Sequence, residues 1–287
     1  MNVPSDTLFA QSDALIAHTA VDRRLTRAVV ATLVVGGYMA VGAAFGLSAN
    51  GYLLLGIPIT IAFQVVVVRR PLRALWLQDA RAMSFTPRSV VAMILIAIAP
   101  VTIAIGAVRD GDPVLAIYGL AAIVGAIGAV YAVRAFNQDA ARSTVQASLI
   151  NGVILVAVMV VFRLVSGGFH GNPGGAVATA IISVATYLPA VFVLEEVFFR
   201  GLLDPYLRGL RPGHDRASAL YGSALWGLWH LPVMSVDLGL LTIPYLVAIH
   251  TVLGHVLVRS WRRTGNLAAP GIAHAVADAL RNAVAVL

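Results

Sequence analysis

The sequence predicts an all-α bundle of membrane-spanning helices, with about nine spans. Composition is the first observation behind this expectation: 59% of the 287 residues are hydrophobic, 11% are charged, and the mean hydropathy is +0.87. A soluble protein carries about 25% charged residues. The second observation is a series of apolar runs of spanning length, and the third is the distribution of arginine between them. The chain contains no cysteine, which excludes disulfides, cysteine-ligated zinc and a thiol nucleophile.

The apolar runs are each close to the roughly 20 residues that a spanning helix needs. Polar or glycine- and proline-rich connections separate them, so each run is expected to form one helix. They cover about residues 28–47, 51–68, 89–108, 114–133, 147–165, 176–199, 217–236, 240–258 and 268–286.

Arginine alternates between the connections. The chain contains no lysine, so arginine carries its formal net charge of +7, which in a membrane protein is typical of cytoplasmic loops rather than of nucleic-acid binding. Every second connection is rich in arginine: Arg69, Arg70, Arg73, Arg81 and Arg88, then Arg134 and Arg142, then Arg208, Arg211 and Arg216, then Arg259, Arg262 and Arg263. The alternate connections hold almost none. We therefore expect a multi-pass protein of the cell membrane with a cytoplasmic N-terminus and an external C-terminus.

Polar groups divide the chain into three parts. The interiors of the first five spans contain no carboxylate, so the chemistry is expected in the C-terminal four helices. We predict a cytoplasmic tail over residues 1–27, accessory transmembrane helices over 28–170 and a catalytic domain over 176–287.

Glu195 and Glu196 are the only glutamates in the chain, and they lie side by side at the end of an apolar run. A charged side chain near the centre of a membrane helix costs about 2.5–3.5 kcal/mol unless it pairs or meets water. In a helix, Glu196 and Arg200 share a face and can pair, whereas Glu195 points about 100° away. The alternative is a helix end capped by an interfacial ion pair.

Histidines mark two further positions in the apolar sequence. His230 follows Trp226 by four residues, and His274 precedes Asp278 by four, which allows that carboxylate to orient the imidazole. For His250 and His255, which have no acidic neighbour in their span, we expect a packing role.

Two glutamates, two histidines and an aspartate on three helices suit a site that activates water. A carboxylate can act as general base, and histidines can hold a metal or polarise a carbonyl. The sequence contains neither the Gly-x-Ser-x-Gly motif of serine hydrolases nor the His-Glu-x-x-His motif of zincins.

These residues resemble the motifs of the CPBP intramembrane proteases, the family of type II CAAX prenyl endopeptidases and of bacteriocin-processing and self-immunity proteins. The Glu-Glu-x-x-x-Arg motif is present from Glu195 to Arg200, with Gly201 after it. The Phe-x-x-x-His motif is present from Trp226 to His230, with tryptophan in place of phenylalanine. The His-x-x-x-Asn/Asp motif is present from His274 to Asp278. The resemblance covers about residues 176–287.

The resemblance implies a helix bundle with a cavity open to the cytosol and an intramembrane endopeptidase that uses water directly. Glu195 would activate water with His230, and Arg200 would fix Glu196. His274 and Asp278 would support the oxyanion or a metal. Two alternatives stay open for the cofactor: zinc bound by Glu195, His230 and His274, or a metal-independent glutamate-type enzyme.

The expected partners are the lipid bilayer and a peptide or membrane-protein substrate, either CAAX-like or another membrane-associated peptide, with no nucleic acid. A non-proteolytic immunity or scaffold protein of the same fold is the main alternative. A proton-coupled transporter is a third, but it would predict inverted repeats and broken helices in both halves, and we find neither.

Two boundaries are open in the sequence. The segment Pro71 to Arg88 is expected to be either an amphipathic surface segment or a solvated loop. If span seven began at Ala217, His230 would lie roughly 20 Å along it, deeper than the other site residues. We therefore expect the span to start later, near Tyr221 or Gly222.

Overall fold

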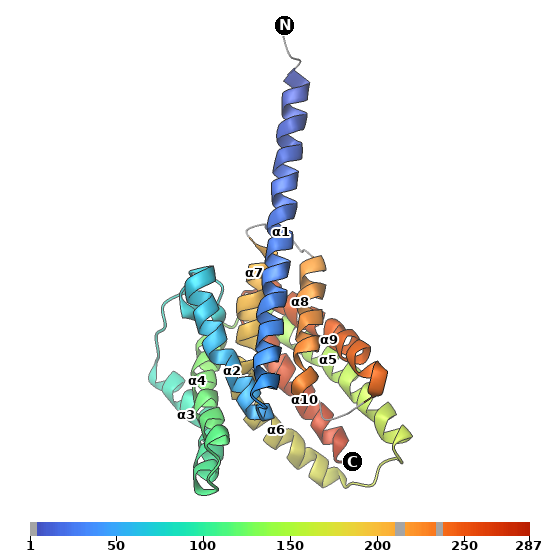
Figure 1. Cartoon of the computed structure of the whole chain (residues 1–287). Helices are drawn as coiled ribbons and strands as arrows, with labels where there is room; N and C mark the ends of the chain where they lie inside the picture. Colours follow the sequence, from blue (N-terminus) through green and yellow to red (C-terminus); the bar gives the residue numbers. More distant parts are fainter. Residues whose placement is uncertain (1–4, 210–215, 234–237) are drawn as a thin grey trace.

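The computed structural model describes residues 5–209, 216–233 and 238–287, with side chains from residue 23 onward, and these parts are helical without strands (Figure 1). The α-helices are α1 Ser5–Ala44, α2 Ala49–Ala62, α3 Pro87–Arg109, α4 Pro113–Val133, α5 Gln138–Val165, α6 Pro173–Leu194, α7 Asp204–Arg208, α8 Arg216–Trp229, α9 Thr242–Thr264 and α10 Ala268–Ala285. Two π-helical stretches, η1 Phe63–Val68 and η3 Val197–Leu203, and three 3₁₀ turns, η2 Leu72–Leu75, η4 Leu231–Val233 and η5 Gly239–Leu241, complete them.

The predicted fold class is confirmed: the chain forms an all-α polytopic bundle. Among the described residues, seven helical segments are long and apolar enough to cross a membrane. The predicted spans 217–236 and 268–286 correspond to α8, with 14 residues, and α10, with 18. Neither is among the seven, because α8 is short and α10 carries His274, Asp278 and Arg281 among its apolar residues.

The central part of the bundle is built by α6 and α10, which lie against each other (Figure 1). Helix α10 also packs on α5, and α5 packs on α9, which in turn packs on α8. The pair α3 and α4 joins this group through α4, which contacts α6. Segments far apart in sequence therefore enclose one region between α5, α6, α8, α9 and α10.

Helix α1 is longer than its predicted span. It begins at Ser5, inside the predicted tail, and its N-terminal part projects beyond the bundle (Figure 1). The segment from Arg23 to Ala44 is the part that is long and apolar enough to cross a membrane.

Aromatic side chains of α1 and α2 support the C-terminal helices. Tyr38 and Tyr52 are buried together, and the ring of each lies beside that of Trp229 at the end of α8. The hydroxyl of Tyr52 donates a 2.8 Å hydrogen bond to the Trp229 carbonyl oxygen. The last carbonyls of a helix lack partners within it, so this tyrosine satisfies one of them.

The segment Pro71 to Arg88 is buried in part of its first half and exposed over residues 81–88. Leu75 and Leu77 are buried, and the indole N–H of Trp76 donates to the Phe192 carbonyl over 3.0 Å. The segment lies so close to η3 that a Cβ at Gly201 would be 2.5 Å from the Leu75 carbonyl oxygen. Glycine at 201 therefore permits this backbone contact.

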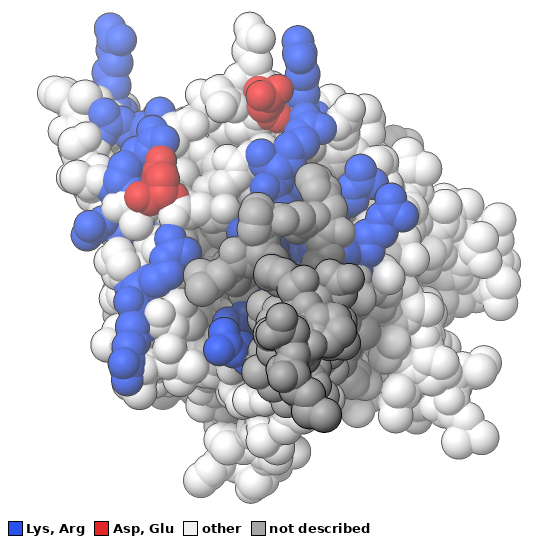
Figure 2. Space-filling model, turned by 90° about the horizontal axis from the view of Figure 1, so that it is seen from above, with Lys and Arg blue, Asp and Glu red and all other residues white. Residues whose placement is uncertain are grey.

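Arginines gather on one face of the molecule, the face from which α1 projects (Figures 1 and 2). Contacts between the arginine-bearing connections join them there: Arg263 donates to the Asp139 carbonyl, and Gln78 N–H donates to the Gly265 carbonyl. The assignment of this face to the cytoplasm stays a prediction based on the positive-inside rule.

Candidate active site

The first site motif lies where the regular α-helix gives way to a wider one. Helix α6 ends at Leu194, and the chain continues through the π-helix η3 into α7, so that Pro173 to Arg208 forms one candidate span of 36 residues. Glu195 and Glu196 therefore lie inside a long helical segment rather than at its end. This position disfavours the interfacial cap that we considered as an alternative. Short π-helical stretches occur frequently at functional sites.

Glu196 and Arg200 form a buried ion pair. Arg200 Nη1 lies 3.1 Å from Glu196 Oε1, and both side chains are at most 1% exposed. The guanidinium also lies over the Trp226 ring, 4.1 Å from its centroid. This pair agrees with the helical spacing of the motif. A buried ion pair needs such close partners to offset the loss of hydration.

The pair continues into a chain of alternating charges on α10. His274 Nδ1 lies 2.8 Å from Glu196 Oε1, His274 Nε2 lies 3.5 Å from Asp278 Oδ2, and Asp278 Oδ1 lies 3.0 Å from Arg281 Nη1. An imidazole that donates from both nitrogens satisfies both carboxylates. Arg281 and the Glu196–His274 contact were not among the residues and contacts predicted from the sequence. Arg281 follows Asp278 by three residues and could have been found from that spacing.

Glu195 faces away from this row of charged groups, toward α8. Its Oε2 accepts a 3.3 Å hydrogen bond from the indole N–H of Trp226 and lies 3.6 Å from His230 Nε2. The Glu195 and His230 side chains are 15% and 21% exposed, whereas Glu196 is fully buried. Glu195 and His230 are thus a pair that water can reach.

The early end of α8 sets the orientation of His230. Pro232 has no N–H to continue the helix, and the His230 N–H bonds instead to the Gly227 carbonyl over 3.2 Å. This leaves the Trp226 carbonyl for the His230 side chain, whose Nδ1 lies 2.8 Å from it. A carbonyl can only accept, so Nδ1 carries the proton and Nε2 of the neutral ring is an acceptor that faces Glu195.

The depth mismatch expected for His230 does not arise, and the later helix start is wrong. Helix α8 begins at Arg216. Glu195 is equally far from the connection between α7 and α8, because the preceding helical segment continues to Arg208 instead of ending near residue 199. Both residues therefore lie about 20 Å from that connection.

Trp226 is the centre of the site. Its ring lies edge-on to those of His230, His250 and His274, at centroid distances of 5.2, 4.8 and 5.3 Å. His250 does pack, as expected, but it packs against His230, with the two rings stacked at 4.1 Å. The position of His250 at the site could not be predicted, because spacing within α9 carries no information about which helix this residue faces.

A cavity of about 540 Å³ opens beside these groups, between α5, α8, α9 and α10. Trp226, His230, His250, His274 and Asp278 line it. Glu195 lies behind Trp226 and His230, which both contact it. The volume is in the range of small-ligand and peptide side-chain pockets.

The residues present do not fit a zinc site of the predicted composition. Among the residues that the structure describes, no three His, Cys, Asp or Glu side chains are grouped to hold a metal. Both nitrogens of His274 face carboxylates, and Nδ1 of His230 is bonded to a carbonyl, so the predicted ligands do not offer free atoms toward one point. The zinc alternative has no support in this donor set.

A membrane bundle that gathers buried carboxylates and histidines beside one cavity is the kind of site expected for an intramembrane hydrolase. Comparison with protein families agrees: residues 176–280 match the family described as Rce1-like, type II CAAX prenyl endopeptidase. This match covers α8, α9, nearly all of α6 and most of α10, and over this part of the chain the resemblance to the CPBP and CAAX proteases is confirmed. The family supports intramembrane endopeptidase activity. Searches among curated proteins and solved structures found no match.

Proposed function

We propose that this protein hydrolyses a peptide bond at the membrane with water activated by Glu195 and His230. The observation that carries the proposal is the 3.6 Å approach of Glu195 Oε2 to His230 Nε2. A water that donates to both acceptors at about 2.8 Å fits such a separation. Both residues belong to motifs within the matched segment.

In the proposed reaction, Glu195 takes one proton from this water while His230 orients it. The resulting hydroxide attacks the carbonyl carbon of the scissile bond, and the C–N bond then breaks. The proton held by Glu195 passes to the leaving nitrogen, so that no covalent enzyme intermediate forms. General base catalysis of this kind contributes about 10²–10⁴ in rate.

His274 has a supporting role in this proposal. Its imidazole lines the cavity between two carboxylates, and its Nε2 is the more loosely held nitrogen, at 3.5 Å from Asp278. An N–H at this position can turn to the developing oxyanion. Glu196 and Arg200 position the ring from behind and do not reach the substrate.

The proposed substrate is the end of a prenylated, CAAX-like protein or another membrane-associated peptide. Tyr187, Leu155 and Met159 line the cavity next to the polar groups and supply the apolar surface that such a segment needs.

The test is cleavage of a quenched peptide by detergent-purified protein. Glu195→Gln keeps the size and polarity of the side chain and removes the base, so turnover should fall about 10²–10⁴-fold. Asp110→Asn, an acid-to-amide change at an exposed carboxylate between α3 and α4, is the matched control and should leave turnover unchanged.

Two other results would redirect the assignment. Full activity of Glu195→Gln would remove Glu195 as the base, and a cellular phenotype that survives this substitution would favour the non-proteolytic alternative. A chelator should leave turnover within about twofold, because the donor groups do not converge. Loss to the chelator with recovery in zinc would instead make His230 and His274 metal ligands.

A further inference from the structure

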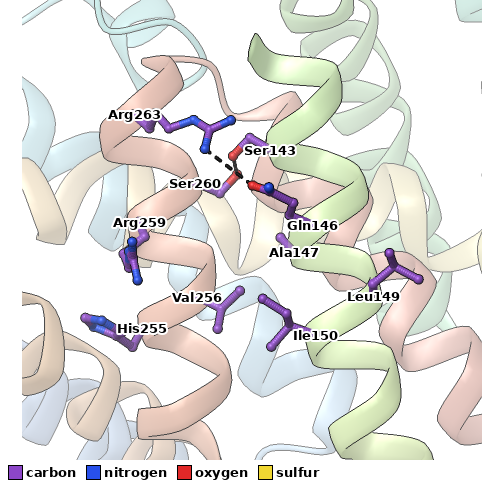
Figure 3. A pocket seen from close by; sticks show the side chains of 10 residues that line it. All are labelled: Ser143, Gln146, Ala147, Leu149, Ile150, His255, Val256, Arg259, Ser260 and Arg263. Carbon is purple, nitrogen blue, oxygen red and sulfur yellow. Dashed lines mark hydrogen bonds between the residues drawn. The ribbon is translucent and has the colours of Figure 1, made fainter. Parts of the chain in front are cut away.

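A second hollow lies between α5 and α9, apart from the site cavity and at the arginine-rich end of the bundle (Figure 3). Its volume is about 450 Å³. Its α9 side carries basic residues: His255, Arg259 and Arg263 follow each other at intervals of four residues along the helix, as Figure 3 shows. This spacing places the three side chains on one face of the helix.

No carboxylate compensates the two arginines in the part of the chain that the structure describes. Arg263 donates to neutral acceptors, Gln146 Oε1 at 3.3 Å and the Asp139 carbonyl at 3.4 Å. Arg259 is exposed and forms no ion pair with a described residue. Their neighbour Arg262 differs, because it pairs with Asp204 over 2.5 Å on another side of α9.

The floor of the hollow is polar and offers a further donor. The Ser143 hydroxyl donates to Ser260 Oγ over 2.9 Å, and both serines are buried. His255 Nδ1 is a buried nitrogen without a hydrogen-bond partner among the described residues. Buried polar atoms are nearly always paired, so an unpaired atom at the edge of a basic hollow points to a ligand with acceptor oxygens.

The end of the hollow away from Arg263 is apolar and open. Leu149 and Ile150 line it and are 63% and 48% exposed. Both belong to α5, one of the helices that can cross the membrane; Ile150 faces Val256 on α9, whereas Leu149 lies on the side of α5 away from α9 (Figure 3). Exposed apolar side chains on such a helix face acyl chains.

We propose that this hollow binds an anionic phospholipid from the leaflet at the arginine-rich face. The phosphate lies between Arg259 and Arg263, and the acyl chains lie along Leu149 and Ile150. Basic hollows between membrane helices are suited to anionic headgroups, and guanidinium groups hold phosphate oxygens through two parallel hydrogen bonds. The apolar end selects a lipid over free phosphate, because only a lipid fills both ends.

Such a lipid would bridge α5 and α9, which also form two of the walls of the site cavity. Asn151 on α5 donates to the Leu253 carbonyl on α9 over 3.3 Å, and both residues line that cavity. The lipid site occupies the next turns of the same two helices toward the arginine-rich end.

The experiment measures lipid retention by the purified full-length chain in neutral detergent, by native mass spectrometry with added phosphatidylglycerol or phosphatidylcholine. We expect preferential binding of phosphatidylglycerol. Arg259→Gln and Arg263→Gln should each weaken it about fivefold, which corresponds to about 1 kcal/mol per basic residue. Ile150→Ser should weaken it as well, without a change in net charge.

Two controls decide whether the hollow itself is responsible. Arg142 lies on α5 next to Ser143 but does not line the hollow, and Arg216 lines a neighbouring hollow on the α8 side, which shares His255 and Arg259 but not Arg263. Arg142→Gln and Arg216→Gln should leave binding unchanged. Equal losses in these controls would overturn the proposal in favour of general surface charge, and competition by millimolar inorganic phosphate together with an unaffected Ile150→Ser would overturn the assignment to a lipid.

Discussion

Trp226 occupies the position where the family motif has phenylalanine, and the structure gives the difference a physical meaning. Phenylalanine offers the same edge-on packing to His230, His250 and His274, but it has no N–H. The indole N–H of Trp226 donates to Glu195, so this chain gives its proposed base a partner that the motif residue does not supply.

Trp226→Phe is therefore expected to lower kcat/KM about tenfold while folding is retained. A hydrogen bond to a charged group contributes about 1.5–3 kcal/mol, and its length of 3.3 Å places it at the lower end. The measurement is cleavage normalised to folded protein. The matched control is Trp76→Phe, which removes an indole bond to the Phe192 carbonyl and should leave normalised turnover unchanged. Equal activity of Trp226→Phe and wild type would show that the Trp226–Glu195 bond does not matter for catalysis.

Glu196 is expected to behave differently from its neighbour Glu195. Glu196→Gln leaves Arg200 buried without a counter-ion, and breaking a buried pair from one side costs about 3–5 kcal/mol. Thermal stability and folded yield should therefore fall together with activity. Thermal unfolding of Glu195→Gln and Glu196→Gln, measured in parallel, checks this contrast. Equal stability of the two variants would contradict it.

Most helix bounds could be predicted from the sequence, and a few could not. Apolar length and arginine position locate every helix of the bundle except the short α7, to within a few residues at most ends, because these signals depend on the chain alone. The main exceptions are the start of α1, the start of α5, the end of the segment that continues α6 to Arg208, and the ends of α8 and α9. Pro232 explains the end of α8, and its effect on His230 depends on which carbonyls the helix leaves free.

The π-helix η3 and the individual contacts within the site could not be predicted in the same way. Helical spacing indicated that Glu196 pairs with Arg200 and that His274 faces Asp278. It could not show that Glu196 also contacts His274, because 78 positions separate them and the contact depends on how α10 packs against α6 and η3. The position of His250 against His230 likewise follows from the packing of α8 on α9.

The accessory helices contribute to the site through Tyr52. Tyr52→Phe removes the hydroxyl that satisfies the Trp229 carbonyl, and leaving such a buried group unpaired costs about 1–3 kcal/mol. Because Trp229 directly precedes His230, we expect a severalfold loss of turnover in addition to lower thermal stability. Tyr131→Phe removes a similar tyrosine-to-carbonyl bond, to Arg81, away from α8 and should lower stability alone. If both variants keep full turnover per folded molecule, α2 does not position His230.

The C-terminus and the arginine-rich connections lie at opposite ends of the bundle. The connection between α5 and α6 lies beside the C-terminus, where the His170 N–H donates to the Leu287 carbonyl over 2.5 Å. The arginine-bearing connections lie on the other face, which Figure 2 shows. The two ends of the bundle therefore differ in positive charge, and such a difference sets the orientation of a protein in the membrane.

We predict that the arginine-rich face is cytoplasmic and that the C-terminus is external. Single cysteines at Ser84, His170 and Leu287 test this in intact cells with a membrane-impermeant thiol reagent, since the chain has no cysteine to remove. Ser84 lies in the exposed connection before α3, close to Arg134, and should be protected until the cells are opened. His170 and Leu287 should label from outside, and they should do so together because their backbones are in contact. Labelling of Ser84 and His170 from the same side would contradict the topology, and labelling of Ser84 alone would invert it and place the arginines against the positive-inside rule.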